Sequence, residues 1–158
     1  MKNIVFLLSS AGPLGQGPVE EPVWESVENR IDRAFEAGGS VELALCEKIY
    51  DPKEGNIVLD TINMSALPGM FRVILTPRRQ NGEKKSTMRE WWEPGDTQFR
   101  GSRKFGDDEW DLRTICTDIS IAKTLFRDFF DHRGVSDTLI QSTYSIWDRS
   151  SWIKPSRI

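Results

Sequence analysis

Residues 40–76 read SVELALCEKIYDPKEGNIVLDTINMSALPGMFRVILT, and this stretch decides the fold class. Apolar side chains at Val41, Leu43 and Leu45 recur with a period of two, which indicates a strand. Turn residues then separate two further β-prone runs, and no helical pattern lies between them. Short connections between consecutive strands predict an antiparallel meander. The strands expected here are 41–45, 57–62 and 71–76, with turns at 51–56 and 67–69.

Strand patterns also lie on both sides of this stretch. A short apolar run near the N-terminus reads as a buried strand, and a glycine- and proline-rich loop at 12–18 follows it. Downstream, the polar loop 78–86 contains Asn81-Gly82, which is typical of a hairpin tip. The further strands expected are 1–8, 88–93, 98–103 and 114–117, with 94–96 joining the second and third of them.

Two helices are expected outside the run of central strands. Pro22 suits the first turn of one helix, which Gly38-Gly39 ends. Asp118 or Ser120 caps the other, which Gly134 ends. Apolar residues at helical spacing are Val23, Trp24, Val27, Ile31, Ala34 and Phe35 in the first helix and Ala122, Leu125, Phe126, Phe129 and Phe130 in the second.

The C-terminal part of the chain gives a weaker signal. Residues 139–147 fit either a helix or a strand, and the alternation at 145–149 favours extended structure. Residues 150–158 are expected to form a flexible surface arm. The predicted architecture is a single α+β domain, 1–158, with a curved antiparallel sheet of about five to seven strands and two main helices packed on one face.

Composition narrows the range of functions. The chain has 158 residues, a net charge of −3 and a pI near 5.3, which argues against direct nucleic-acid binding and favours a basic partner. Cys46 and Cys116 lie in β-prone surroundings and are expected to be buried, reduced thiols. The apolar run at 4–8 is too short for a secretion signal or a membrane span, so we expect a cytoplasmic protein that does not interact with membranes.

Two features, the loop at 12–18 and His132, contain residue types that are used in ligand binding or catalysis. Neither has the residue spacing of a known site. The loop at 12–18 lacks the lysine and hydroxyl residue of a phosphate-binding loop, and Glu20 and Glu21 would repel an anion. His132, the single histidine, stands near the end of the second helix beside Asp131. It can act as a helix-end cation, or as a general acid or base with Asp128 or Asp131 as its orienting group. No cofactor or metal site is expected, because the cysteines and histidine have no ligand spacing.

Residues 89–112, REWWEPGDTQFRGSRKFGDDEWDL, hold the main candidate for a binding surface. Four carboxylates surround one indole there, at Asp107, Asp108, Glu109, Trp110 and Asp111. The spacing lacks the glycine and terminal glutamate of a calcium loop, and neighbouring acids rarely face each other as in a glycosidase. Two interpretations remain open: a solvated turn before a strand, or a surface for a basic partner with Trp110 as an exposed anchor.

Trp91 and Trp92 add to this candidate. Adjacent residues in a strand point to opposite faces, so one ring can enter the core while the other needs separate cover. That cover can come from a partner, or from the chain's own C-terminal segment with Trp147 and Trp152.

The layout of the chain resembles the immunity proteins of bacterial polymorphic-toxin and contact-dependent growth inhibition systems. The similar segments are 38–43 (GGSVEL), 110–118 (WDLRTICTD) and 145–148 (SIWD). The resemblance implies a non-enzymatic protein that binds and neutralises a cognate toxin domain, often a basic nuclease. The alternatives are a small hydrolase-type enzyme that uses His132, and a structural domain that binds copies of itself. We expect a monomer. On composition, the partner-binding residues are Trp91, Trp92, Asp107, Asp108, Glu109, Trp110 and Asp111.

Overall fold

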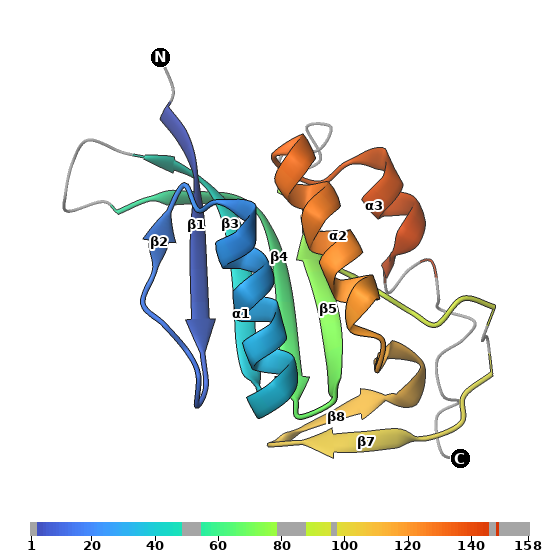
Figure 1. The fold of residues 1–158 in the computed structure, drawn as a ribbon. Helices are drawn as coiled ribbons and strands as arrows, with labels where there is room; N and C mark the ends of the chain where they lie inside the picture. The colour runs from blue at the N-terminus through green and yellow to red at the C-terminus, as the bar shows by residue number, and fades with distance from the viewer. Residues whose placement is uncertain (1–2, 49–54, 79–87, 96–97, 146–147, 149–158) are drawn as a thin grey trace.

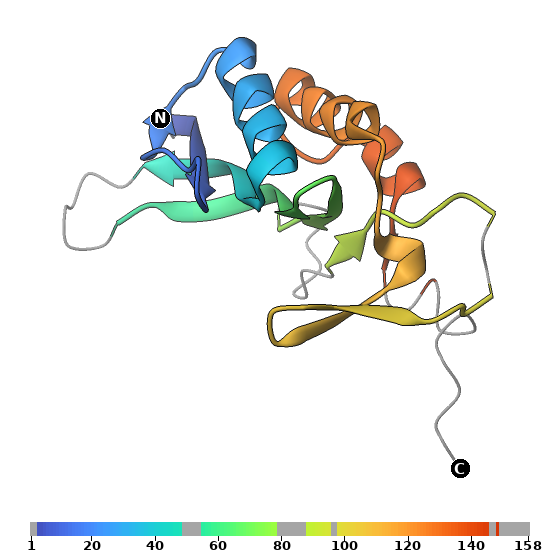
Figure 2. The ribbon, with the colours of Figure 1, turned by 60° about the horizontal axis from the view of Figure 1, so that its bottom comes forward.

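A computed structural model of the protein describes residues 3–48, 55–78, 88–95, 98–145 and 148. Seven strands form one antiparallel sheet in the order β2-β1-β3-β4-β5-β6-β9. The helices α1 and α2 cover one face of this sheet (Figures 1 and 2). The α+β class, the antiparallel sheet and the two main helices are therefore confirmed. The sheet strands are β1 (Asn3–Ala11), β2 (Val19–Glu20), β3 (Gly39–Lys48), β4 (Ile57–Leu67), β5 (Met70–Thr76), β6 (Arg89–Glu90) and β9 (Tyr144–Ser145).

The remaining elements are α1 (Trp24–Ala37), α2 (Ile119–His132), the short α3 (Asp137–Ser142) and a hairpin outside the main sheet. Strands β7 (Ser102–Phe105) and β8 (Asp108–Asp111) form this hairpin. It lies on the side of the sheet away from α1 and α2 (Figure 2). A single turn of 3-10 helix, Leu112–Thr114, connects the hairpin toward α2.

The core fills the layer between the sheet and the two helices. Alternate strand residues such as Leu43, Ile62 and Phe71 are fully buried there, as are Ile31 of α1 and Phe126 of α2. In β3, β4 and β5 the period-two pattern thus places alternate side chains in this layer. A smaller cluster of Val5, Ala44 and Cys46, with Leu7 and Val58 packed against it, forms a second hydrophobic core.

Backbone geometry explains where α1 begins and ends. Pro22 precedes the helix rather than forming its first turn, and Val23 is the N-cap residue. Gly38 and Gly39 end α1 with φ values of 83° and 116°, which L side chains rarely adopt. A Cβ on Gly39 would lie 2.1 Å from the Ala11 carbonyl oxygen, so the glycine also permits β1 and β3 to meet.

Capping by polar side chains sets the ends of α2 and α3. The Asp118 carboxylate accepts hydrogen bonds from the Ser120 amide and hydroxyl, at 3.0 and 2.6 Å. At the other end of α2, Arg133 adopts the left-handed conformation before Gly134. Ser136 then caps α3 by accepting from the Leu139 amide. Residues 137–142 are thus helical with Ser136 as the cap, so extended structure is wrong for 139–142. Tyr144 and Ser145 are extended in β9, and residues 146–147 lie outside the described part of the chain.

The strand predictions for 88–93, 98–103 and 114–117 were too long or misplaced. Only Arg89–Glu90 pairs with β5, and β7 begins at Ser102. Cys116 makes an isolated bridge with Phe71. The acidic cluster forms most of β8 rather than a turn before a strand, because Lys104 and Phe105 pair with Glu109 and Asp108. The predicted hairpin tip at 81–82 and arm at 150–158 lie outside the described residues.

Contacts of two carboxylates, Glu21 and Asp60, fix the edge and ends of the sheet. Glu21 accepts a hydrogen bond from the Phe6 amide at 2.9 Å and forms an ion pair with Arg133. The buried Asp60 carboxylate accepts from the Arg78 and Val135 amides, at 2.9 and 3.1 Å. These contacts join segments that are far apart in sequence.

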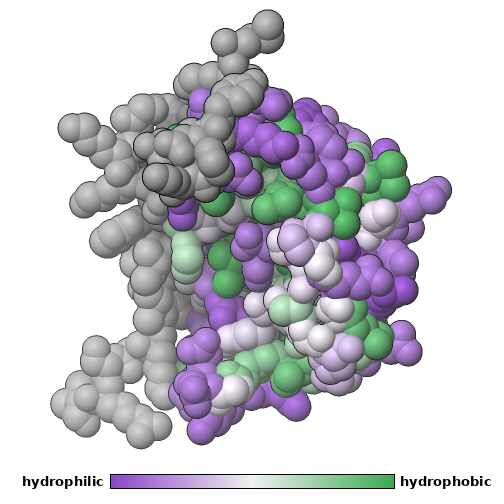
Figure 3. All heavy atoms as spheres, turned by 90° about the vertical axis from the view of Figure 1, so that its left-hand side faces the viewer, coloured by the Kyte–Doolittle hydropathy of each residue, from purple (hydrophilic) through white to green (hydrophobic). Residues whose placement is uncertain are grey.

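The side of the molecule at the β2 edge carries separate hydrophobic patches among hydrophilic residues (Figure 3). Leu14, Val19 and Val23 are exposed large hydrophobics of this region of the chain. Among the described residues, no helix is long and apolar enough to span a membrane.

Candidate functional site

The β7–β8 hairpin carries the acidic cluster that the sequence singles out. Asp107, Asp108 and Glu109 are exposed near its turn. The Trp110 ring stacks on Phe105, with centroids 3.5 Å apart and planes 17° apart. The Arg72 guanidinium lies 4.6 Å from the centroid of the Trp110 ring. Only 7% of Trp110 is exposed, so the expectation of an exposed Trp110 anchor is wrong. The indole instead fastens the hairpin to β5.

Asp111, the last carboxylate of the hairpin, binds a buried arginine. Its carboxylate accepts hydrogen bonds from the Arg113 amide, Nε and Nη2, at 2.9, 3.0 and 2.8 Å. Arg113 is fully buried, and its guanidinium lies 4.6 Å from the centroid of the Trp92 ring. A buried cation needs such a partner, because desolvation of an unpaired charge is costly. Asp111 therefore differs from the three exposed carboxylates before it.

The exposed surface of the hairpin has both signs of charge. Arg103 and Lys104 of β7 are exposed, and their register partners are Trp110 and Glu109. The carboxylates gather at the turn end, while the cations lie on the opposing strand. A basic partner would therefore approach this hairpin best from its turn.

Trp91 and Trp92 follow β6 rather than lie within it, and both are buried, with 8% and 3% exposed. Trp91 belongs to the main core, and its amide donates to the Val73 carbonyl at 3.1 Å. Trp92 is instead covered by Arg113. Neither ring is therefore exposed for a partner, whereas the alternative of cover by the C-terminal segment concerns residues that the structure does not describe. Trp147 and Trp152 lie outside the described residues.

Both tryptophans nevertheless line a hollow of about 400 Å³. Its walls come from three regions of the chain: the segment after β6, helix α2, and the turn from α3 into β9. The lining residues are Trp91, Trp92, Pro94, Ile121, Thr124, Leu125, Gln141, Ser142 and Tyr144. The sequence could not indicate this hollow, because its walls lie up to some fifty positions apart and meet only through the fold.

A second hollow of about 260 Å³ adjoins the first and shares Trp91, Pro94 and Ile121 with it. Here the wall includes two carboxylates, Glu93 and Asp118. Hydrogen bonds from Ser120 hold the pKa of Asp118 below its ordinary value of 3.8, so this side chain is charged at neutral pH. The two hollows together form a groove with an apolar half and an acidic half, which we call the Trp91 groove.

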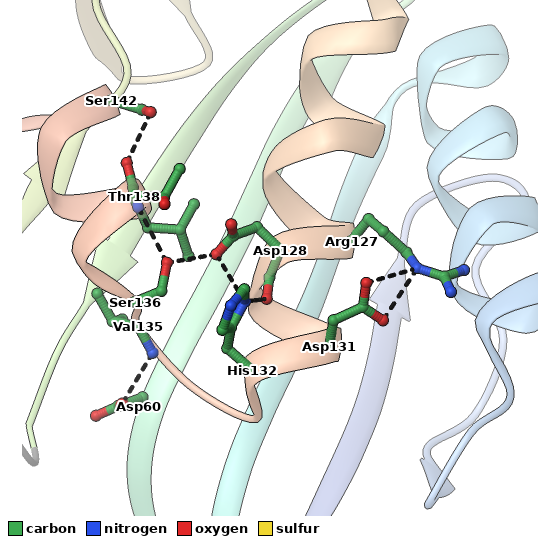
Figure 4. A network of polar contacts seen from close by, with 10 residues as sticks. Asp60, Arg127, Asp128, Asp131, His132, Val135, Ser136, Thr138 and Ser142 are labelled. Carbon is green, nitrogen blue, oxygen red and sulfur yellow. Dashed lines mark hydrogen bonds and ion pairs between the residues drawn. The ribbon is translucent and has the colours of Figure 1, made fainter.

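His132 stands at the exposed end of α2, with 58% of its side chain accessible (Figure 4). Its Nδ1 lies 2.9 Å from the Asp128 carbonyl oxygen and 3.4 Å from the Asp128 carboxylate. That carboxylate also accepts from the Ser136 hydroxyl at 2.5 Å. Ser136 therefore directs its proton to Asp128 and not to His132, and Asp128 supports the cap of α3. A nucleophilic triad needs the histidine between the other two groups.

The glycine-rich loop is closed by a cation from α1. Arg30 is buried and donates to the carbonyl oxygens of Gln16 and Gly17, at 3.3 and 2.8 Å, and to the Ser10 hydroxyl at 3.2 Å. Burial lowers the pKa of this guanidinium from its ordinary value. The carbonyl groups of the loop thus face an internal arginine.

Cys46 and Cys116 are free and buried, as predicted. Burial raises the pKa of both thiols, which disfavours the reactive thiolate. Within the described ranges, no group of three or more His, Cys, Asp or Glu side chains is placed to hold a metal ion.

The fold and these sites define an α+β protein with an open antiparallel sheet, a helical layer on one face and an appended acidic hairpin. The chain belongs to DUF6911, a family of unknown function whose model matches residues 9–139. It is similar in fold to a hypothetical protein from Neisseria gonorrhoeae, with a TM-score of 0.57 and 15% identity. That match covers 87% of this chain and 92% of the other. No curated protein matches the sequence.

Proposed function

We propose that this protein is a non-enzymatic immunity protein that binds and neutralises a basic toxin domain. The observation that carries the proposal is the β7–β8 hairpin, which stands outside the main sheet and exposes Asp107, Asp108 and Glu109 at its turn. The identity of the partner as a toxin follows from the resemblance of the sequence to immunity proteins.

Preorganisation supports the use of this hairpin as a contact surface. Trp110, stacked between Phe105 and Arg72, and Arg113, held by Asp111, fix the hairpin against the rest of the molecule. A rigid arm loses little conformational entropy on binding, so its contacts convert into affinity more fully. Trp110, which the sequence predicts at the interface, is thus buried and holds the exposed carboxylates of the hairpin in place.

Electrostatics support a basic partner. The chain has a net charge of −3 at neutral pH. Among the described residues, the buried charged side chains are Arg30, Arg113, Asp60 and Glu90, two of each sign, so the charge of the described interior is balanced. Exposed carboxylates steer a basic protein into contact and raise the association rate, with an effect that falls as salt is added.

The test is inhibition of the toxin domain encoded beside this gene, measured with purified proteins. The variant Asp107→Lys/Asp108→Lys is expected to slow association by about tenfold or more and to flatten its salt dependence. The matched control is Glu25→Lys/Glu36→Lys, two exposed carboxylates on α1 with the same change in net charge. Equal effects of the two double variants would refute the role of the hairpin.

The non-enzymatic part of the proposal has its own test. Inhibition is expected to be complete at one equivalent, to reverse on dissociation, and to change less than about twofold in His132→Ala, because His132 lies at a helix end away from the hairpin. Inhibition of many toxin molecules by one copy, abolished in His132→Ala, would instead establish an enzyme.

A further inference from the structure

The Trp91 groove has features of a recognition site separate from the hairpin. Its apolar half, about 400 Å³, falls within the size range of roughly 300–1,000 Å³ that ligand pockets occupy. Side chains of Trp91, Ile121 and Leu125 form its floor, while Pro94 and Gln141 are exposed at its rim. Rigid aromatic walls with a polar rim are the usual composition of a binding hot spot.

The walls of the groove are held in place before any ligand arrives. Trp91 hydrogen-bonds through its amide to β5, and Trp92 stacks on the buried Arg113. The Glu93 amide also donates to the Arg113 carbonyl at 2.8 Å. The segment that carries both indoles is thus attached at three points, and an apolar group entering the groove would meet a preformed surface.

The acidic half decides the chemistry of the occupant. Among the described residues that line it, Glu93 and Asp118 are charged and both are negative. Arg100 pairs with Glu93 at 2.5 Å from outside the groove, and the two side chains remain about half exposed. Asp118 has serine as its hydrogen-bonding partner and keeps its full charge. Charge complementarity therefore favours a ligand that places a cation beside an apolar group.

We propose that the Trp91 groove binds a peptide segment of a protein partner in which an aromatic or aliphatic residue lies close to a lysine or arginine. The apolar side chain enters the half lined by Trp91 and Leu125, and the cation lies against Glu93 and Asp118. This inference rests on the proposed function, because the segment belongs to the protein that the hairpin attracts.

The test uses a phage-displayed library of random linear peptides as the probe, selected against the full-length protein. Selected peptides are expected to share an apolar residue next to, or a few positions from, a lysine or arginine. In fluorescence titrations, Gln141→Trp at the rim is expected to weaken their binding by more than about tenfold, because the new indole occupies the groove. Thr138→Trp, at an exposed position of α3 that does not line the groove, is its matched control and is expected to leave affinity within about twofold.

A second variant tests the acidic half without disturbing the fold. Glu93→Gln/Asp118→Asn removes both charges but retains an acceptor for Arg100 and a good helix cap. The double variant is expected to lower the affinity for cation-bearing peptides by about fivefold to tenfold. Its affinity for peptides with glutamine in place of the cation is expected to stay unchanged. Circular dichroism and thermal unfolding establish that each variant is folded.

The outcomes separate this inference from the proposed function. Absence of selected peptides, peptides without the apolar–cation pair, or binding unaffected by Gln141→Trp would each overturn the groove as a recognition site. If Gln141→Trp inhibits the toxin normally while Asp107→Lys/Asp108→Lys does not, the inference about the groove fails and the proposed function stands. If the peptides bind as expected but the neighbouring toxin is not inhibited, the groove stands and the toxin partner is wrong.

Discussion

The ion pair between Glu21 and Arg133 gives a quantitative test of how the sheet edge is joined to the end of α2. Arg133 donates to both carboxylate oxygens of Glu21, at 2.9 and 3.2 Å, and also to the Ile4 carbonyl at 3.2 Å. Its guanidinium lies 4.6 Å from the centroid of the Phe6 ring. The perturbation is a double-mutant cycle with Glu21→Gln and Arg133→Met, which remove both charges and keep an unbranched aliphatic stem at each position.

Exposure limits the expected magnitude. Both side chains are 46% exposed, so solvent screens the pair and its coupling lies within the range measured for surface pairs. The bidentate geometry favours the upper part of that range, and we expect a coupling of about 0.5–1 kcal/mol. Arg133→Met alone is expected to cost about 1.5–2 kcal/mol, since it also removes the bond to Ile4 and the contact with Phe6.

Backbone strain does not enter this cycle. Glu21 and Arg133 have φ values of 48° and 49°, and they are the two non-glycine residues with positive φ among those that the structure describes. A left-handed residue with a Cβ costs on the order of 1 kcal/mol. Glutamine and methionine retain that cost, so the measured difference reports the side-chain contacts.

The coupling is expected to depend on pH in a defined direction. Hydrogen bonds from Arg133 hold the pKa of Glu21 below its ordinary value of 4.5. A carboxylate with a depressed pKa in the folded state stabilises fully above its ordinary pKa and loses that contribution as pH falls through the folded-state value. The coupling should therefore be complete at neutral pH and absent once the pH is well below 4.5.

Urea unfolding followed by tryptophan fluorescence measures the four variants at each pH. The matched control is the pair of Lys48 and Glu20, at 2.6 Å with 39% and 46% exposure, in which a single ammonium replaces the planar guanidinium. Its coupling, from Lys48→Met and Glu20→Gln, is expected to be about 0.5 kcal/mol or less. A Glu21–Arg133 coupling of zero at neutral pH, or one that persists in acid, would refute the reasoning.

Three further predictions concern stability and reactivity. Asp60→Ala should lower the free energy of unfolding by about 2–4 kcal/mol in urea titrations, because two amides lose a buried acceptor; an effect below about 1 kcal/mol would contradict this. Gly39→Ala should destabilise by more than about 2 kcal/mol, whereas Gly106→Ala, with φ of 57° and open space around it, should cost about 1 kcal/mol; equal losses would refute the close approach at Gly39. Cys46 and Cys116 should react with a thiol reagent at pH 8 far more slowly in the native protein than in urea, and rapid native labelling would contradict their raised pKa values.

The central strands and both long helices could be predicted because their signals are local. In β4 and β5, alternate positions such as Ile62, Met64 and Val73 enter one core, so a pattern of period two in the sequence maps directly onto the sheet. Helix caps are local as well, and Asp118 was among the candidates. The failures begin where pairing depends on distant segments, as for β6 with β9 and for the single bridge between Phe71 and Cys116.

The candidate site was harder to predict for a specific physical reason. Sequence reasoning expected Trp110 at the surface because carboxylates surround it, but Arg72, on another strand, covers its ring. A comparable contact joins two helices, because the Arg127 guanidinium of α2 lies 5.0 Å from the ring centroid of the half-buried Trp24 of α1. A tryptophan can thus have charged neighbours in sequence and still be buried by a charged neighbour in space.

This packing changes what an aromatic and acidic sequence implies about binding. Trp110 is already buried and stacked on Arg72 in the free protein, and these contacts stabilise the hairpin. Because the same contacts are present before and after binding, they add nothing to the binding free energy. Truncation of Trp110 would therefore weaken partner binding mainly by loosening the hairpin, whereas charge reversal at Asp107 and Asp108 acts on association directly. A Trp110→Phe variant, which retains a ring for Phe105 and Arg72, should consequently preserve binding within about threefold, while Trp110→Ala should lose both hairpin order and affinity. Loss of affinity in Trp110→Phe without loss of stability would show that the indole itself touches the partner.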